Sequence, residues 1–294
     1  MNKRILATMF ALLAAALYAI NIPFSKLLIE YVDATMMAGL LYFGAGVGML
    51  LLTTTRGLLG KKAIKEPLTK KELPYTIAMV LLDIAAPILL MNGLAITSSA
   101  NATLLNNFEI VATSIVALVV FKEFISKRLW IAIGLVTVSS IILTFDGIES
   151  FTFNGGSLLV LGAAICWGFE NNCTNMISNK SSEEIVIIKG IFSGLGSIIA
   201  ALVIGERLPE LLYIVLVMIL GFVSYGLSIN FYISAQKYIG AAKTSAYYSI
   251  APFLGVIFSL LLLGECPDMQ FYIALVIMLI GTILIVRDTI YYKK

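Results

Sequence analysis

The clearest pattern in the sequence is a series of long apolar runs separated by short polar segments. A helix needs about 20 apolar residues to cross a bilayer's hydrocarbon core, and these runs are apolar on every face over that length. Strands of membrane barrels instead alternate apolar and polar residues over about ten positions. The pattern predicts an all-α integral membrane protein with ten transmembrane helices. They cover residues 5–28, 34–55, 73–95, 99–121, 129–145, 155–177, 184–204, 211–235, 241–264 and 270–287.

Composition supports this fold class. Of the 294 residues, 60% are hydrophobic and only 13% are charged, whereas soluble globular chains carry about 25% charged residues. The apolar character of the first run continues past Tyr18, which favours an uncleaved first helix over a signal peptide.

The positions of the basic residues predict the orientation. With a cytoplasmic N-terminus, 18 of the 20 Lys and Arg residues fall in cytoplasmic segments, and only Lys26 and Arg207 lie on or near the other side. Positive charge concentrates on the cytoplasmic side of membrane proteins. We therefore expect a multi-pass protein of the cell (inner or plasma) membrane with both termini cytoplasmic. Its basic loop around 56–72 is expected to meet anionic lipid heads.

The chain contains an internal repeat. A shift of 142 places residues 100–123 on 242–265, and a shift of 149 places Tyr18 and Asn21 on Trp167 and Glu170. We therefore predict two five-helix repeats, residues 1–147 and 148–294. Because five is odd, the second repeat enters the membrane from the opposite side. Inverted repeats of this kind are typical of secondary transporters that bind substrate near the midplane, although duplication also builds static channels.

Three acidic residues, Asp83, Glu109 and Glu170, lie near the middle of predicted helices. No Lys or Arg is predicted to lie equally deep. Charges inside a bilayer are costly and face the bundle interior or a wet cavity. An unpaired carboxylate there tends to hold a proton, so these acids are candidates for proton coupling or for binding a positively charged group. The alternative is a protonated acid that hydrogen-bonds two helices together.

Other polar and aromatic side chains share helix faces with these acids, at spacings of three, four and seven residues. Acids beside aromatic rings could hold an ammonium group by charge and cation–π attraction, although aromatic residues at helical spacing also occur as plain packing. The predicted substrate-binding or proton-coupling residues are Glu109, Glu170, Asp83, Asn106, Trp167, Asn171, Tyr18, Asn21, Tyr247 and Tyr248.

Several short segments resemble a known family. Tyr18-Ala19 and Trp167-Gly168 resemble the Trp-Gly pair in the first helix of each half of EamA-type proteins. Lys122-Glu123 and Leu263-Gly264-Glu265 resemble that family's Gly-Glu turn, and residues 105–112 resemble a bacterial subgroup. The chain thus resembles the EamA branch of the drug/metabolite transporter superfamily along its whole length. The resemblance implies ten helices in two inverted halves and export or exchange of small metabolites, including amino acid export. Ala19 and Lys122 depart from the family's glycines.

The sequence also lacks features that other functions need. It contains no histidine and no Gly-x-x-x-x-Gly-Lys-Ser/Thr loop, so His-based nucleophile pairs, His-ligated zinc and an ATP motor are excluded. We predict a secondary active transporter, not an enzyme, without cofactor or metal. The substrate would be a small polar metabolite, an amino acid or an organic cation. The alternatives are a passive channel-like facilitator and an intramembrane enzyme, whose usual Gly-x-Gly-Asp motif is missing. Expected partners are the substrate, membrane lipids and candidate protons, without nucleic acid, in a monomer or homodimer.

Overall fold

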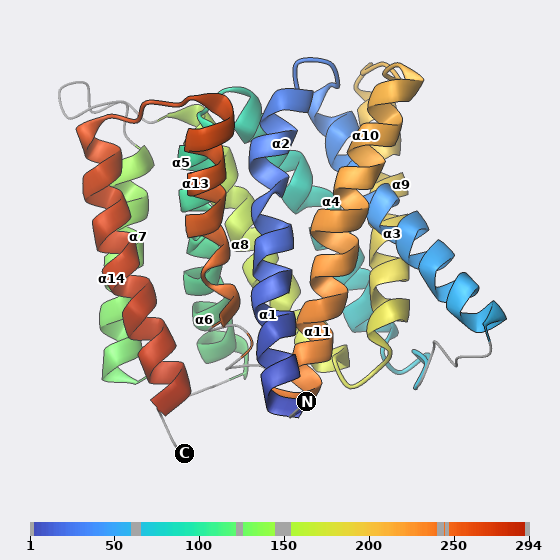
Figure 1. Cartoon of the computed structure of the whole chain (residues 1–294), viewed down its shortest axis with the longest axis horizontal. Helices are drawn as coiled ribbons and strands as arrows, with labels where there is room; N and C mark the ends of the chain where they lie inside the picture. Colours follow the sequence, from blue (N-terminus) through green and yellow to red (C-terminus); the bar gives the residue numbers. More distant parts are fainter. Residues whose placement is uncertain are drawn as a thin grey trace.

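The chain folds into a bundle of roughly parallel helices. The structure is a computed structural model that describes residues 3–59, 66–121, 126–144, 154–239, 244 and 247–291, and within these ranges it contains no strand. Both ends of the chain lie at the same end of the bundle (Figure 1). This arrangement is the one that ten spans require, because an even number of crossings returns the chain to its starting side.

The described helices match the ten predicted spans. The first half contains α1 (Lys3–Ala19), α2 (Asn21–Leu28), α3 (Ala34–Leu58), α4 (Leu73–Ala95), α5 (Ser99–Leu105), α6 (Phe108–Phe121) and α7 (Lys127–Thr144). The second half contains α8 (Gly155–Ile177), α9 (Ser182–Val203), α10 (Leu211–Gly221), the π-helix η1 (Phe222–Leu227), α11 (Ser228–Ile239), α13 (Ala251–Leu263) and α14 (Met269–Tyr291). We call each of these ten spans a column; three columns consist of consecutive elements, namely α1 with α2, α5 with α6, and α10 with η1 and α11. The predicted repeat boundary at 147/148, Lys122-Glu123 and most of residues 240–246 lie outside the described residues.

Length and hydropathy support the reading of these columns as membrane spans. Within the described residues, eight helices or joined helices are long and apolar enough to cross a bilayer, and α13 is a shorter apolar helix. The remaining column, α8, is 23 residues long but carries Glu170 and several asparagines in its second half. Its lower hydropathy therefore reflects the polar residues that it brings into the bundle.

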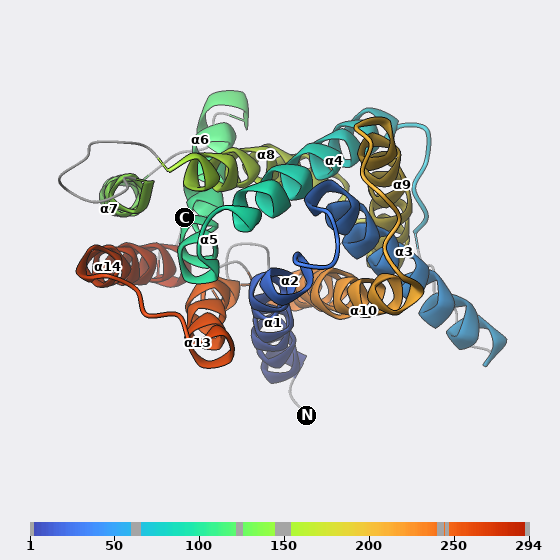
Figure 2. The same cartoon turned by 90° about the horizontal axis from the view of Figure 1, so that it is seen from above.

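Several pairs of helices join the halves by close backbone contact, among them α3 with α9, α4 with α8 and α3 with α10. In α3 and α9, a Cβ atom added to Gly190 would lie 2.3 Å from the backbone nitrogen of Gly46, and one added to Gly194 would lie 2.4 Å from the nitrogen of Phe43. The pair α4 and α8, side by side in Figure 2, has a similar contact, because a Cβ on Gly93 would lie 2.7 Å from the carbonyl oxygen of Gly156. Small residues allow membrane helices to approach this closely. The glycines at 44–48 and 190–196 therefore bind the two halves together.

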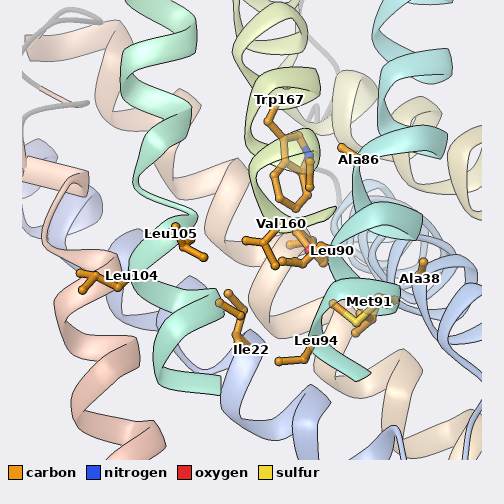
Figure 3. Packing of buried hydrophobic residues seen from close by; sticks show 14 of the residues in the cluster. Ile22, Ala38, Ala86, Leu90, Met91, Leu94, Leu104, Leu105, Val160 and Trp167 are labelled. Carbon is orange, nitrogen blue, oxygen red and sulfur yellow. The ribbon is translucent and has the colours of Figure 1, made fainter. Parts of the chain in front are cut away.

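The apolar core lies between these pairs and the first helix column. Figure 3 shows Trp167 and Val160 of α8 near Leu90 of α4, with Ile22 of α2 and Leu105 of α5 close by. Leu90, Leu105 and Val160 are fully buried. Packing of this core sets the rotation of α4, α5 and α8 about their axes. It therefore also sets the direction of the polar residues on neighbouring turns of the same helices.

Three of the ten columns are interrupted within the bundle. α1 and α2 are separated by Ile20, and α5 and α6 are separated by Asn106 and Asn107. The column of α10 and α11 contains η1, where backbone hydrogen bonds skip one more residue than in an α-helix. Transporters often form their substrate sites from broken helices of this kind.

Candidate functional site

A network of polar side chains joins the three interrupted columns. Asn21, at the start of α2, donates a hydrogen bond from Nδ2 to the hydroxyl of Tyr225 in η1, at 2.9 Å. Asn106, between α5 and α6, donates to the hydroxyl of Tyr18 in α1, at 3.0 Å. Asn21, Tyr225 and Asn106 are buried, and Tyr18 is half-buried. Four of the predicted or neighbouring site residues thus meet where the helices are broken.

Glu109 lies beside this network, in the first turn of α6. Its Oε1 accepts a hydrogen bond from Asn171 Nδ2 of α8 at 2.5 Å, and the same amide is 3.4 Å from Thr113 Oγ1. Glu109 and Asn171 are both half-buried. Among the described residues, Glu109 forms no ion pair with Lys or Arg. It is therefore the acid that fits the predicted unpaired carboxylate.

The other two acids share one lysine. Lys189 of α9 places its Nζ 3.1 Å from Asp83 Oδ2 of α4 and 2.8 Å from Glu170 Oε1 of α8. Asp83 and Glu170 are at most 1% exposed, and Lys189 is 6% exposed. The prediction that no Lys or Arg lies as deep as the acids is wrong, as is the assignment of Lys189 to a cytoplasmic segment. Lys189 lies seven residues after the start of α9 at Ser182, which is about 10 Å along the helix axis.

Aromatic side chains connect the ion cluster to the broken helices. Tyr42 of α3 donates its hydroxyl proton to Asp83 Oδ1 at 2.9 Å and accepts a hydrogen bond from Trp167 Nε1 at 3.2 Å. Its ring centroid is 4.8 Å from that of Tyr225. Trp167 and Tyr42 are 5% and 2% exposed, so the predicted site residue Trp167 serves to orient Tyr42, with its ring in the core.

Four tyrosine rings form a chain from η1 towards α11. The Tyr18 ring lies 5.9 Å from Tyr225 in an edge-on arrangement and 5.7 Å from Tyr248, which in turn lies 5.0 Å from Tyr232. Glu109 lies within electrostatic range of Tyr18, Tyr225 and Tyr248. The predicted residue Tyr247 is half-buried and forms no ring contact or hydrogen bond with this chain of tyrosines within the described part of the protein.

One buried acceptor of the network lacks a donor. Within the part of the chain that the structure describes, Asn106 Oδ1 has no hydrogen-bond partner, although Asn106 is only 3% exposed. Burying such a polar atom without a partner is unfavourable. Together with Glu109 it provides two acceptor groups three residues apart. Three carboxylates and one ammonium thus lie in the cluster, so its fixed charge is negative when the acids are ionised.

Hydrogen bonds join α5 of the first half to α13 of the second half at the end of the bundle opposite the termini. Gly264 ends α13 with a left-handed φ of 61°, and Glu265 then accepts hydrogen bonds from the backbone N–H groups of Ser99 and Ala100, at 2.7 and 2.8 Å. Ser99 Oγ and Ser259 Oγ are 2.8 Å apart. We call this set of contacts the α5–α13 seal. It gives the Gly-Glu turn a physical role, because the glycine directs the chain back and the glutamate caps α5.

Lys26, one of the two basic residues predicted on this side, also has a defined role. Its Nζ donates to the carbonyl oxygens of Leu94 and Thr97, at 2.6 and 2.7 Å, where α4 ends. Carbonyl groups at a helix C-terminus lack intrahelical partners and carry partial negative charge. This pairing gives the lysine a defined partner at this end of the bundle.

Sequence reasoning missed Lys189 and Tyr42 as members of the cluster. Lys189 follows Ile187 and Ile188 within a predicted span, and a charge inside an apolar run was the available signal. Tyr42 gave no such signal, because a single tyrosine in a membrane helix is compatible with any environment. Within the described residues, no group of three His, Cys, Asp or Glu side chains is placed to hold a metal ion.

Comparison with known proteins agrees with this architecture. The EamA-like transporter family matches residues 5–145 and again residues 154–287. An uncharacterized transporter of Methanothermobacter thermautotrophicus is 23% identical over 290 residues, covering 92% of this chain and 83% of the relative. A crystal structure of a protein whose name states no function superposes with a TM-score of 0.69 at 14% identity, and the match covers 98% of each chain. This structural likeness concerns the fold alone.

Proposed function

The chain belongs to the EamA-like transporter family, and from this premise we propose that it is a secondary transporter for a small organic cation. Membership favours a transporter over an enzyme and leaves the substrate class open. The proposal for the substrate rests on the site's own chemistry, and the single observation that carries it is the environment of Glu109.

Glu109 is a carboxylate inside the bundle that accepts a hydrogen bond from the neutral amide of Asn171. Asp83 and Glu170, by contrast, share the ammonium of Lys189. A buried carboxylate is costly unless it is paired or protonated. Glu109 is therefore suited to accept the positive charge of a substrate or, in its absence, a proton.

The surroundings of Glu109 favour an ammonium group. Asn106 Oδ1 offers a second acceptor, and Tyr18, Tyr225 and Tyr248 offer aromatic faces for cation–π attraction. An amino acid would also need a positively charged partner for its carboxylate, and Lys189 is held by two acids already. These features support an organic cation over a zwitterionic amino acid or an anion.

A proton and a cation that compete for Glu109 would couple transport to a pH gradient. A substrate ammonium approaching from one side displaces the proton from the Glu109 carboxyl to water, and release of the substrate on the other side lets Glu109 take up a new proton. The Glu109 carboxylate is thus neutralised in both states, by the substrate ammonium in one and by a proton in the other. Coupling then needs only that the site open to one side at a time.

We propose that the α5–α13 seal is one of the two gates that this cycle requires. Together with the positive-inside rule, which favours cytoplasmic termini in a cell membrane, it supports a conformation closed towards the outside. Substrate exchange with the outside would break the hydrogen bonds of Glu265 to Ser99 and Ala100.

The test is flux in proteoliposomes that contain an unlabelled quaternary amine, with the radiolabelled amine added outside. We expect saturable counterflow and uptake driven by a pH gradient, both lost in Glu109→Gln with unchanged expression and thermal unfolding. Glu72→Gln is the control, since Thr69 hydrogen bonds lower the pKa of this partly exposed acid and it remains ionised outside the spans. Unaltered flux in Glu109→Gln would contradict the proposal. Flux without saturation or counterflow would indicate a passive channel.

A further inference from the structure

Lys189 carries the chain's own ammonium group into the polar cluster. It reaches across the boundary between the halves, since Asp83 belongs to the first half, whereas Glu170 and Lys189 belong to the second. The two acid–ammonium distances, 3.1 Å to Asp83 and 2.8 Å to Glu170, are those of direct ion pairs, and the shorter one lies in the range of a charge-assisted hydrogen bond. The two acids therefore form a place shaped to receive one ammonium group between them.

Stability alone is a weak reason for this arrangement. A buried ion pair costs much of its attraction in desolvation, and apolar residues of similar volume often serve as well or better. The helices that carry the three charges are already joined by close contacts. Gly93 of α4 lies against Gly156 of α8, and a Cβ added to Gly196 of α9 would lie 2.3 Å from the Ile84 side chain of α4. A role connected with the charge itself is therefore the better explanation of Lys189.

Asp83 and Glu170, the two acids that bind Lys189, lie next to the proposed substrate position at Glu109. Asn171, the residue after Glu170, donates its hydrogen bond to Glu109. Glu109 is also within electrostatic range of both Glu170 and Lys189. On the other side, Tyr42 contacts Asp83 through its hydroxyl and Tyr225 through its ring. The cluster thus has two neighbouring acceptor positions, Glu109 and the Asp83–Glu170 pair.

We propose that Asp83 and Glu170 form a second ammonium subsite that Lys189 permanently occupies, so that the carrier takes monocations and discriminates against diamines. The proposal rests on the proposed function, because it assumes that Glu109 receives a substrate ammonium. The second ammonium of a diamine would meet the like charge of Lys189, and such contacts oppose binding. Lys189 is in this sense a specificity-determining residue.

The proposal predicts a gain of binding when the lysine is made neutral. Lys189→Met keeps a long, flexible side chain but leaves both acids without their cation. A diamine of suitable length could then place one ammonium at Glu109 and the other between Asp83 and Glu170. A merely structural lysine would give lower stability without any change in ligand preference.

The experiment compares matched amines on the purified full-length protein at neutral pH. Butylamine, pentylamine, diaminobutane and diaminopentane are titrated, with dissociation constants from calorimetry and melting shifts as a second readout. The parent should bind each monoamine at least as tightly as its diamine. Lys189→Met should reverse this preference by about tenfold or more, whereas Lys189→Arg should keep the parental order.

The matched control is Lys180→Met. Lys180 lies in the segment between α8 and α9, and its Nζ is 3.6 Å from Glu72 Oε1. This substitution should leave the amine preference unchanged. If Lys189→Met does not fold, Asp83→Asn/Lys189→Met removes one charge of each sign and leaves Glu170 as the second acceptor. This double variant should also prefer diamines.

Folded variants that keep the parental preference for monoamines would overturn the inference, and so would a parent that binds diamines more tightly than monoamines. The proposed function fails in a different way, namely if no amine binds the parent or if binding persists in Glu109→Gln. The two failures are therefore distinguishable in one set of titrations.

Discussion

Tyr42 shows how a single hydroxyl group can hold the buried charges in place. It donates to Asp83 and accepts from the indole of Trp167, so one group satisfies polar atoms on α4 and α8 from its position on α3. Asp83 Oδ1 would lose this donor if the hydroxyl were removed. A buried acceptor left in that way is destabilising.

We expect Tyr42→Phe to lower the free energy of unfolding by about 1–3 kcal/mol, measured by thermal or denaturant unfolding in detergent. Tyr31→Phe is the control, because the Tyr31 ring stacks on Tyr213 at the surface and is 56% exposed. It should change stability by less than about 0.5 kcal/mol. Equal effects of the two substitutions would show that the Tyr42 hydroxyl contributes nothing specific.

At the residue scale, the sequence predicted which acids lie deep but not how they are paired. Asp83, Glu109 and Glu170 stand out because any charge in an apolar run does so. Their pairing depends on which helices become neighbours and on how each is rotated. Lys189 reaches Asp83 from a helix more than a hundred residues away, and no local pattern contains that information.

At the scale of helices, glycines recur at close spacing at 44–48 and 190–196, a pattern that favours close packing of membrane helices without indicating which helices meet. The structure places Gly46 against the backbone of Gly190 and Ile191. The ten spans were likewise readable, since length and hydropathy determine them. The breaks at Ile20 and at Asn106–Asn107 were not predicted, because interruption of an apolar helix depends on partners from other columns.

Gly46→Ala should be clearly destabilising. A Cβ atom at this position would lie 2.5 Å from the backbone nitrogen of Ile191, so the helices must move apart at a cost of about 1–3 kcal/mol. Gly134→Ala in α7 is the matched control, since a Cβ there meets nothing within 4 Å, and it should be neutral or stabilising by up to about 1 kcal/mol. The measurement is the melting temperature of each purified variant relative to that of the parent. An unchanged melting temperature in Gly46→Ala would contradict the close contact.

At the scale of the whole molecule, the two halves are interlocked and do not lie side by side. α3 packs on α9 and α4 packs on α8, both by direct backbone approach. Opening the bundle along the boundary between the repeats would separate both pairs. Movement during transport is therefore expected at the α5–α13 seal, with the helices that approach each other by their backbones as the stationary frame.

A crosslink through the seal tests this expectation. The hydroxyl oxygens of Ser99 and Ser259 are 2.8 Å apart, so cysteines at both positions should form a disulfide under oxidation. In a Cys266→Ser background, oxidised Ser99→Cys/Ser259→Cys protein should lose substrate flux, and a reducing agent should restore it. The two single-cysteine variants serve as controls. Full flux through the crosslinked protein would mean that the seal need not open.

The π-helical segment Phe222–Leu227 makes the geometry of its column depend on the exact number of residues. A π-turn accommodates one residue more than an α-turn, and each residue rotates an α-helix by about 100°. Deleting one residue upstream of Ser228 would therefore either restore an unbroken α-helix, and carry Tyr225 away from Asn21, or turn the faces of α10 and α11 relative to each other. In an alignment of related chains, insertions and deletions should accordingly be excluded from this stretch even where substitutions are accepted, so that conserved spacing marks the site more reliably than conserved residue identity.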